Sequence, residues 1–320
     1  MFVSELLTST ILSSLLPIVV TLMLGFVAGW HHDFDGRQAA ILNRMVMLYA
    51  LPLNLFAGMM STPRNAVLAQ VPLALAILLS MAGTYAIVLV IARYFCGRDL
   101  MTSSLQALAI GGPAVPFVGV PVLGHLFGTA SAIPISVASL VMNLIQVPAT
   151  LMLLSAGMGA KNGAAGGGGP TLASHIVHAL REPVVWAPLL ALVLVLVNVK
   201  PVGPIQESLV LLGRATGGVA LFASGIVLFS RHVAISLPTT ISVFTRNIVV
   251  PGVTLALLLV AGFAPETTRE VLLTMAIPTA SICVILAVQY QTAEQEMAST
   301  LFFSTILSVV TMGAFIWLTA

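Results

Sequence analysis

The fold depends on the stretch AIGGPAVPFVGVP, residues 109–121, in which three prolines and three glycines stand among apolar side chains. A proline lacks an amide donor, and its ring clashes with the carbonyl group four residues earlier. The stretch therefore cannot form one continuous helix, although it lies in a run, residues 100–160, without Asp, Glu, Lys or Arg. In lipid, an unpaired backbone group costs several kcal/mol unless protein or water satisfies it. We expect a helix broken inside a protein-lined cavity, where the positive N-terminal end of the second half suits a carboxylate.

A second stretch, AIPTASICVILA at residues 276–287, carries Pro278 directly after the same Ala-Ile pair. We expect a second broken helix here, and we expect the two breaks to cross near the middle of the membrane. Interrupted helices of this kind mark the binding sites of many transporters. The alternative is a pair of ordinary proline kinks in packed helices.

The composition of the chain points to a membrane protein. Its 320 residues are 59% hydrophobic and 7% charged, and the mean hydropathy is +1.10. Soluble domains usually carry about 25% charged residues, so a water-soluble enzyme and a disordered chain are excluded. Twelve Lys and Arg against ten Asp and Glu leave a formal charge of +2. Because no basic patch is present, a nucleic-acid partner is not expected.

Ten apolar runs predict an all-α polytopic membrane protein with ten transmembrane helices. A bilayer core of about 30 Å requires roughly 20 apolar residues per helix, and the long uncharged run divides in two at Gly124–Ser131. The runs are 11–30, about 42–60, 68–92, the two parts of 100–160, 183–199, 208–230, 233–262, 271–293 and 297–320.

Basic residues in the short loops predict the orientation, since they favour the cytoplasmic side. One side of the membrane would hold seven of them: Arg37, Arg44, Arg93, Arg98, Lys161, Arg181 and Arg231. The other side would hold three: Arg64, Lys200 and Arg269. The first side is therefore predicted to be cytoplasmic, and with an even number of spans both termini would lie outside.

The glycine-rich segment GMGAKNGAAGGGGP, residues 157–170, separates the predicted halves. Such a segment is typical of a flexible linker. We divide the chain into a first five-helix repeat (1–156), a cytoplasmic linker (157–174) and a second five-helix repeat (175–320). Five spans are an odd number, so related halves would be inverted repeats, a common transporter plan. Two echoes support this: LPLNLFAGM (51–59) with GGVALFASGI (217–226), and the two proline stretches with each other.

Several motifs occur in an order and spacing that resemble one known family. They are LNRMVMLYALPLNLFAG (42–58), FVGVPVLGHLFG (117–128), ALFASG (220–225), and Pro278 followed by the tetrapeptide AVQY (287–290). Over its whole length the chain resembles the auxin efflux carrier family, close to its bacterial malonate-carrier branch. The resemblance implies ten helices in two inverted five-helix repeats, a scaffold and a transport domain, and broken helices four and nine that cross.

The chain departs from the family pattern at two positions. Many members carry Asn in the span-four crossover where this chain has Ala114, and many carry proline where it has Gly218. Without the Asn, the substrate contacts of the plant carriers do not transfer directly. Recognition would rely more on backbone dipoles and on other polar side chains.

Among the amides inside predicted spans, we single out Asn54 in span two, and Asn143 and Gln146 in span five. The last two are three residues apart and would share one helix face. A buried amide needs a partner, which is either the substrate or a neighbouring helix.

Arg214 and Arg246 are ionised side chains that lie inside predicted spans. An arginine at the membrane centre costs at least about 2.5–3.5 kcal/mol. Each either extends to the lipid headgroups or forms a cation at one mouth of the pathway that attracts an anion. No Asp or Glu lies inside a predicted span, which argues against a carboxylate proton relay.

The candidate substrate-binding residues are Asn54, Gly112, Pro113, Ala114, Pro116, Asn143, Gln146, Arg214, Arg246 and Pro278. No metal site and no cofactor are expected, because the two histidines at 175 and 178 have helical spacing but no third ligand. The two cysteines, Cys96 and Cys283, fit neither a disulfide framework nor a metal spacing.

These features favour a secondary carrier of a small organic anion in the bacterial inner membrane. The family resemblance implies malonate or a related short carboxylate. The alternatives are a carrier of auxin-like aromatic carboxylates and a sodium-coupled symporter of the bile-acid type. An intramembrane enzyme is disfavoured, since no HExxH, GxSxG or paired intramembrane aspartates occur, and a passive channel would need more polar positions. The small-residue spacing Gly213–Gly217 is compatible with packing inside the fold or with a homodimer.

Overall fold

The computed structural model describes residues 16–17, 19–61, 64–161, 181, 183–199, 203–230 and 234–319. These residues are almost entirely helical, and none of them belongs to a β-strand. The one departure from helix that resembles a sheet is an isolated antiparallel bridge between Pro113 and Thr279. The all-α class predicted from the sequence is therefore confirmed for the described residues.

The first half of the chain forms a helix at Val19–Trp30 and then a series of α-helices joined by tighter or wider turns. The α-helices are α2 (Gly36–Met45), α3 (Leu51–Met60), α4 (Arg64–Ala69), α5 (Val71–Val90), α6 (Leu100–Gly111), α7 (Val120–Phe127), α8 (Ala132–Val141) and α9 (Val147–Lys161). The joining segments are the π turns η1 (Val46–Ala50), η2 (Ile91–Phe95), η3 (Val115–Gly119) and η5 (Met142–Gln146), and the 3-10 turn η4 (Gly128–Ser131).

The second half continues in the same way. Its helices are α11 (Pro183–Leu196), α12 (Gly203–Gly213), α13 (Ala215–Ser230), α14 (Leu237–Phe244), α15 (Val250–Val260), α16 (Pro265–Ala276), α17 (Ile282–Gln289) and α18 (Glu294–Leu318). One π turn, η6 (Thr245–Val249), joins α14 to α15.

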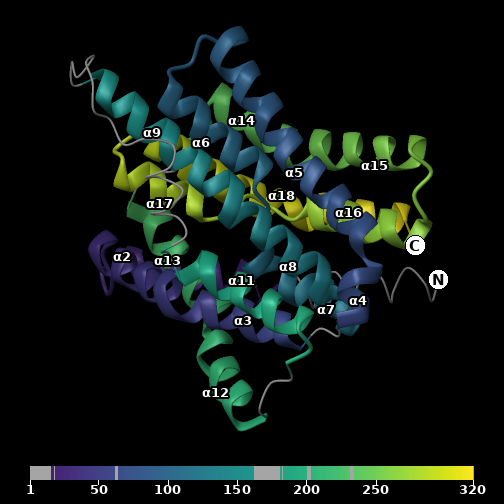
Figure 1. Ribbon diagram of the computed structural model, residues 1–320. Helices are drawn as coiled ribbons and strands as arrows, with labels where there is room; N and C mark the ends of the chain where they lie inside the picture. The colour runs from purple at the N-terminus through teal and green to yellow at the C-terminus, as the bar shows by residue number, and fades with distance from the viewer. Residues whose placement is uncertain are drawn as a thin grey trace, which may run out of the picture.

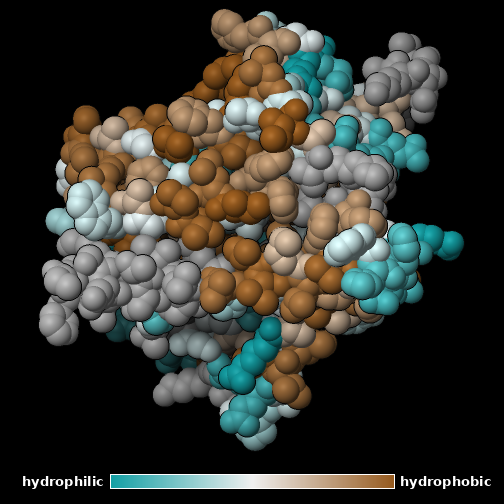
Figure 2. All heavy atoms as spheres, turned by 180° about the vertical axis from the view of Figure 1, so that it is seen from behind, coloured by the Kyte–Doolittle hydropathy of each residue, from teal (hydrophilic) through white to brown (hydrophobic). Residues whose placement is uncertain are grey.

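Six continuous helical segments in the described part of the chain are long and apolar enough to cross a membrane. They are Gly36–Met60, Val71–Phe95, Ile133–Met158, Gly203–Val227, Leu237–Val260 and Glu294–Leu318. Many large apolar side chains on them are exposed, and Figure 2 shows hydrophobic residues covering much of one face while hydrophilic residues gather toward its edges. Exposed apolar surface of this extent requires a lipid surrounding. The chain is a polytopic membrane protein.

The helices form two groups (Figure 1). In one group α5, α6, α9, α14, α15, α16, α17 and α18 pack together, and in the other α3 contacts α11 and α12 while α2 contacts α13. Helix α8 lies between the groups and contacts both α5 and α3. The largest buried cluster lies mainly in the first group, with side chains such as Ile77, Leu105 and Leu273 at its centre. We call the first group the crossover group and the second the α3 group.

Polar caps begin several helices. The side chain of Asp35 accepts from Gln38 N at the start of α2, and the side chain of Gln38 accepts from Asp35 N, both at 2.8 Å. Asp99 accepts from Thr102 N at 3.0 Å at the start of α6. Each side chain satisfies an amide that a helix N-terminus leaves without a partner.

Two glycines allow the helix Val19–Trp30 to cross α13 backbone to backbone. A Cβ atom at Gly25 would lie 2.0 Å from the carbonyl oxygen of Phe222, and one at Gly225 would lie 2.1 Å from that of Leu22. No side chain fits at either position. This close approach is the geometry that small residues permit between membrane helices.

Two differences between the observed element boundaries and the sequence-based expectation concern the linker and the second broken helix. Helix α9 continues to Lys161, so the first five residues of the predicted linker are helical, and the remainder, 162–174, lies outside the described residues. Helix α16 begins at Pro265 rather than near Val271, and it therefore includes the charged residues Glu266, Arg269 and Glu270. Those charges lower the local hydropathy without ending the helix.

Candidate functional site

The two proline-containing stretches meet, and both leave the helical path where they meet. Helix α6 ends at Gly111 and α16 ends at Ala276. The extended residues that follow pair as antiparallel strands do, with Ala114 N donating to Pro278 O at 2.9 Å and Ala280 N donating to Gly112 O at 3.1 Å. We call residues 112–114 and 277–281 the crossover. The expectation that both helices are broken is confirmed.

The carboxyl end of α6 is fully paired at the crossover. A helix leaves its last four carbonyl groups without intrahelical partners, and each of those of α6 accepts a hydrogen bond. The pairs are Gly112 N to Leu108 O at 2.8 Å, Thr279 Oγ1 to Ala109 O at 3.0 Å, Arg246 Nη1 to Ile110 O at 2.9 Å and Gln146 Nε2 to Gly111 O at 2.9 Å.

Arg246 joins the ends of both broken helices. Its Nη1 donates to Ile110 O of α6, and its Nη2 donates to Ile277 O, directly after α16. The side chain is 0% exposed. Extension to the headgroups therefore does not describe this arginine. No carboxylate pairs with it among the described residues, and its Nε finds no acceptor there.

Arg246 also balances the partial negative charges of the two helix C-termini. Each helix C-terminus carries about half a negative charge, so the two ends together present about one. A guanidinium between them balances that charge, which gives a physical reason for an arginine buried without a carboxylate.

A small polar cluster of Asn247, Ser304 and Thr279 connects η6, α18 and the crossover. Asn247 Nδ2 donates to Ser304 O at 2.7 Å, and Ser304 Oγ donates to Asn247 Oδ1 at 2.6 Å. Thr279 N donates to the same Ser304 Oγ at 3.2 Å. Arg246 and Asn247 are neighbours in the π turn η6, so one turn holds both the crossover and α18.

Gln146 supports the crossover from the side of α5. Its Nε2 donates to Gly111 O at 2.9 Å and to Met81 O at 3.0 Å. Its Oε1 accepts no hydrogen bond from a described residue and would lie 3.3 Å from a Cβ at Gly112. The same Cβ would lie 2.7 Å from Leu108 O. Glycine is therefore required at 112 by the close approach of its surroundings.

The second halves of the two broken helices begin with N-termini, which carry a partial positive charge. Helix α17 begins at Ile282, directly after the crossover, and its N-cap Ser281 makes no side-chain capping bond. The π turn η3 begins at Val115 on the other strand. Helix N-termini are positive and bind anions. Both of these N-termini begin directly after the crossover, where the carboxyl end of α6 is already paired.

The structure places six of the ten candidate residues together at the crossover. Gly112, Pro113, Ala114 and Pro278 form its two strands, and Gln146 and Arg246 donate to neighbouring carbonyls. The side chain of Pro116, in η3, lies outside the described part of the structure.

Asn143 lies beside the crossover, and two other candidates lie elsewhere. Asn143 is 4% exposed and its side chain makes no hydrogen bond to a described residue, and its neighbour Met142 would lie 3.3 Å from a Cβ at Gly112. Asn54 lies in α3 against Gly213. Arg214 is exposed at the turn between α12 and α13. Asn143 and Gln146 also share a π turn, which separates them further around the helix than α-helical spacing predicts.

Thr279, Asn247 and Ser304 are site residues that the sequence reasoning did not single out. A signal existed for the first two, since Thr279 follows Pro278 and Asn247 follows Arg246. For Ser304 the signal was weaker: it is one of several small polar residues that recur along α18 at helical spacing, among them Ser308 and Thr311.

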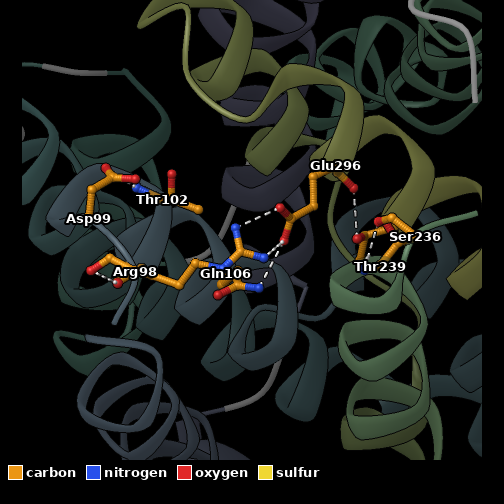
Figure 3. A network of polar contacts seen from close by, with 9 residues as sticks. Arg98, Asp99, Thr102, Gln106, Ser236, Thr239 and Glu296 are labelled. Carbon is orange, nitrogen blue, oxygen red and sulfur yellow. Dashed lines mark hydrogen bonds and ion pairs between the residues drawn. The ribbon is translucent and has the colours of Figure 1, made fainter. Parts of the chain in front are cut away.

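A second polar cluster ties the start of α6 to the start of α18 (Figure 3). Arg98 donates from Nη1 and Nη2 to the two carboxylate oxygens of Glu296, at 2.9 and 3.2 Å, and Gln106 Nε2 donates to Glu296 Oε1 at 2.8 Å. The ion pair is partly exposed. Both helices belong to the crossover group, so this cluster stiffens that group.

Glu270 is a buried carboxylic acid that composition did not reveal. It lies in α16, one residue before the predicted span nine, and is 8% exposed.

Apolar helices and two broken segments that pair at their breaks are typical of membrane transport proteins. The comparisons with known proteins agree. The chain belongs to the family described as "Membrane transport protein", whose profile matches residues 10–316, and the resemblance to the auxin efflux carriers is thereby confirmed.

Two relatives indicate the kind of cargo and activity found among similar proteins. An "Uncharacterized transporter YfdV" of Escherichia coli (strain K12) is 31% identical over 312 residues, which cover 96% of each chain. A "Putative malonate transporter" of Rhizobium meliloti (strain 1021) is 23% identical over 310 residues, which cover 95% of this chain and 94% of the relative. The family and these relatives are transporters, not enzymes.

Proposed function

We propose that the protein is a secondary active carrier of a small organic anion, with malonate or a related short carboxylate as cargo. The observation that carries the proposal is the charge arrangement of the crossover. Arg246 pairs the carbonyl ends of the two first halves, and the N-termini of η3 and α17 begin on the other side of the break. An anion is the ligand that such helix ends favour.

The cargo would bind where the crossover, η5 and α17 meet. The buried amide of Asn143 has no hydrogen bond within the described part of the chain, so a carboxylate oxygen could accept from it. The name of the Rhizobium meliloti relative supports malonate as the first candidate. Auxin-like aromatic carboxylates are the second candidate, through the family resemblance.

Alternating access would arise from movement of the crossover group against the α3 group. The glycine crossing between Val19–Trp30 and α13, together with the contacts of α3 with α11 and α12, supports the α3 group as the stationary scaffold. The Arg98–Glu296 cluster supports the other group as a rigid moving body. Rigid-body movement of one bundle around a fixed site is common among carriers built from repeats.

The proposed architecture is ten membrane helices in two inverted repeats, 1–156 and 175–320, joined by a cytoplasmic linker. Both termini would lie on the outer side of a bacterial inner membrane. The paired breaks in α6 and α16, one from each half, support this symmetry.

Counterflow in vesicles reconstituted with the full-length protein tests the function. Vesicles loaded with unlabelled malonate should take up labelled malonate, and unlabelled short dicarboxylates outside should compete more strongly than indole-acetate. Accumulation against a concentration gradient distinguishes a carrier from a channel. If another acid exchanges and malonate does not, the malonate assignment is wrong; if no organic anion exchanges, the anion carrier itself is refuted.

A further inference from the structure

We propose that Arg246 is a built-in cation of the crossover, which stands where a carrier with the same broken helices would otherwise need an inorganic cation such as sodium. The inference rests on the proposed anion carrier and adds how that carrier balances its charge. If Arg246 supplies this charge, anion exchange is independent of sodium, and Arg246 is a positioning residue for the anion site.

The first step of the argument concerns the carbonyl groups. In discontinuous membrane helices, unwound carbonyl groups and half-helix C-termini commonly coordinate Na⁺. Here the corresponding groups are occupied by protein donors: the guanidinium of Arg246 donates to both Ile110 O and Ile277 O, and Gln146 donates to Gly111 O. Pro278 O and Gly112 O accept from backbone amides across the crossover.

The second step concerns charge. The two C-terminal ends contribute about one negative charge in total, and one guanidinium balances it. An additional sodium ion at the same carbonyl groups would add a second positive charge beside a buried arginine, which low dielectric strongly disfavours. Arginine stays protonated throughout the physiological pH range, so the balancing charge is permanent.

The third step concerns the rigidity of the arginine. Arg246 is fully buried, and its neighbour Asn247 is anchored to Ser304 by two hydrogen bonds of 2.7 and 2.6 Å. Ser304 in turn accepts from Thr279 N in the crossover. The guanidinium therefore has a fixed position relative to both broken helices, as a bound ion would.

The test uses full-length Arg246→Ala protein, wild-type protein and Arg37→Ala as the matched control. Arg37 is an exposed arginine at the start of α2, so its removal changes the net charge equally without touching the crossover. Three quantities are measured in sodium, in choline and in choline with millimolar methylguanidinium: the thermal midpoint in detergent, the malonate affinity and the rate of counterflow.

Wild-type and Arg37→Ala proteins should give the same midpoint and the same counterflow in sodium and in choline. Arg246→Ala should have a lower midpoint in choline, and its dissociation constant for malonate should rise by at least about tenfold, as expected when a charge-assisted contact is lost. Methylguanidinium or sodium should restore a large part of both, because either cation can enter the vacated space. A purely structural arginine would not confer this requirement for an external cation.

Three results overturn the inference. One is that wild-type protein exchanges malonate only when sodium is present. The protein would then still be an anion carrier, but Arg246 would not replace a sodium ion. Another is Arg246→Ala protein that matches wild type in choline. The third is folded Arg246→Ala protein that neither cation improves.

Arg246→Lys keeps the inference testable if Arg246→Ala does not fold. Lysine retains the charge but has a compact head that cannot span both carbonyls as a guanidinium does. It should fold, remain independent of sodium and bind malonate more weakly. A sodium requirement in Arg246→Lys protein contradicts the inference. If wild-type protein exchanges no anion, the proposed function fails, while the effect of methylguanidinium on the midpoint of the arginine variant still reports on the built-in cation.

Discussion

At the scale of single residues, Gln146 and Arg246 use the same device from opposite sides of the crossover. Each donates two hydrogen bonds to main-chain carbonyls on two different elements: Gln146 to Gly111 and Met81, Arg246 to Ile110 and Ile277. An unpaired carbonyl in lipid has no water to accept from. These two side chains therefore provide the hydrogen-bond donors that water provides at the helix ends of a soluble protein.

Replacing Gln146 with Leu should destabilise the protein, because Gly111 O and Met81 O lose their side-chain donor. We expect a loss of about 1–3 kcal/mol, the cost of leaving a buried polar group unpaired, measured as a lower thermal midpoint in detergent.

Asn143→Leu is the matched control for Gln146→Leu, since Asn143 lies in the same π turn and its side chain makes no hydrogen bond to a described residue. It should leave the midpoint nearly unchanged and weaken malonate binding. If the two variants lose equal stability, the distinction between a structural and a ligand-facing amide is incorrect.

Glu296→Gln should weaken the link between α6 and α18. The carboxylate accepts from Arg98 and Gln106, and charge-assisted hydrogen bonds of this kind are stronger than neutral ones. Because the pair is 26% and 15% exposed, salt screens it partly. We expect a loss of about 1 kcal/mol at low salt that shrinks at high salt. Thermal midpoints of both proteins across a salt series provide the measurement, and a difference that stays constant with salt would contradict an ionic origin.

At the scale of elements, prolines and π turns occur together. Four of the five π turns in the described part of the chain are followed, at the second residue, by a proline: Pro52 after η1, Pro121 after η3, Pro148 after η5 and Pro251 after η6. The carbonyl with which each proline ring would clash lies four residues earlier, inside the turn. A wider turn moves that carbonyl aside, and the amide after each of three of these turns donates five residues back, as Leu51 N does to Val46 O. Prolines therefore determine how the turns that carry Gln146 and Arg246 are oriented.

The glycine crossing between Val19–Trp30 and α13 yields the prediction for this scale. In Gly225→Ala the new Cβ would lie 2.1 Å from Leu22 O and 2.7 Å from Phe26 N, so the two helices must separate. We expect a loss of about 1–3 kcal/mol from overpacking, measured as a lower thermal midpoint.

Gly218→Ala is the control in the same helix, because a Cβ there meets nothing within 4 Å. It should be neutral, or stabilising by up to about 1 kcal/mol through helix propensity. Equal midpoints for the two alanine variants would mean that the crossing tolerates a side chain.

At the scale of the whole molecule, the sequence predicts what depends on local geometry and misses what depends on distant partners. The breaks after Gly111 and Ala276 follow from Pro113 and Pro278, whose effect on a helix is the same wherever they stand. The pairing of Arg246 with Ile110 and Ile277 joins residues 136 and 31 positions apart. Only the packed helices bring these groups together, so no local pattern could assign that role.

Hydropathy has the same limit. Six of the apolar runs overlap helices that are long and apolar enough to cross a membrane among the described residues. Helix α16 begins six residues before its apolar run, because Pro265 and the charges that follow it are compatible with a helix at the membrane surface. The early start matters for function, because it brings the buried Glu270 into the first half of a broken helix.

The proposed orientation makes a prediction for the whole molecule through a native cysteine. Cys96 is exposed between α5 and α6, on the side that basic residues assign to the cytoplasm, and Cys283 is buried. A membrane-impermeant maleimide should leave wild-type protein unlabelled in intact cells and label it in inverted vesicles. In Cys96→Ser/Ala261→Cys protein, whose new thiol lies in the exposed turn after α15, the pattern should reverse. Labelling of Cys96 in intact cells would show that the proposed orientation is wrong and that both termini lie in the cytoplasm. The pairing at the crossover would not be affected by that result.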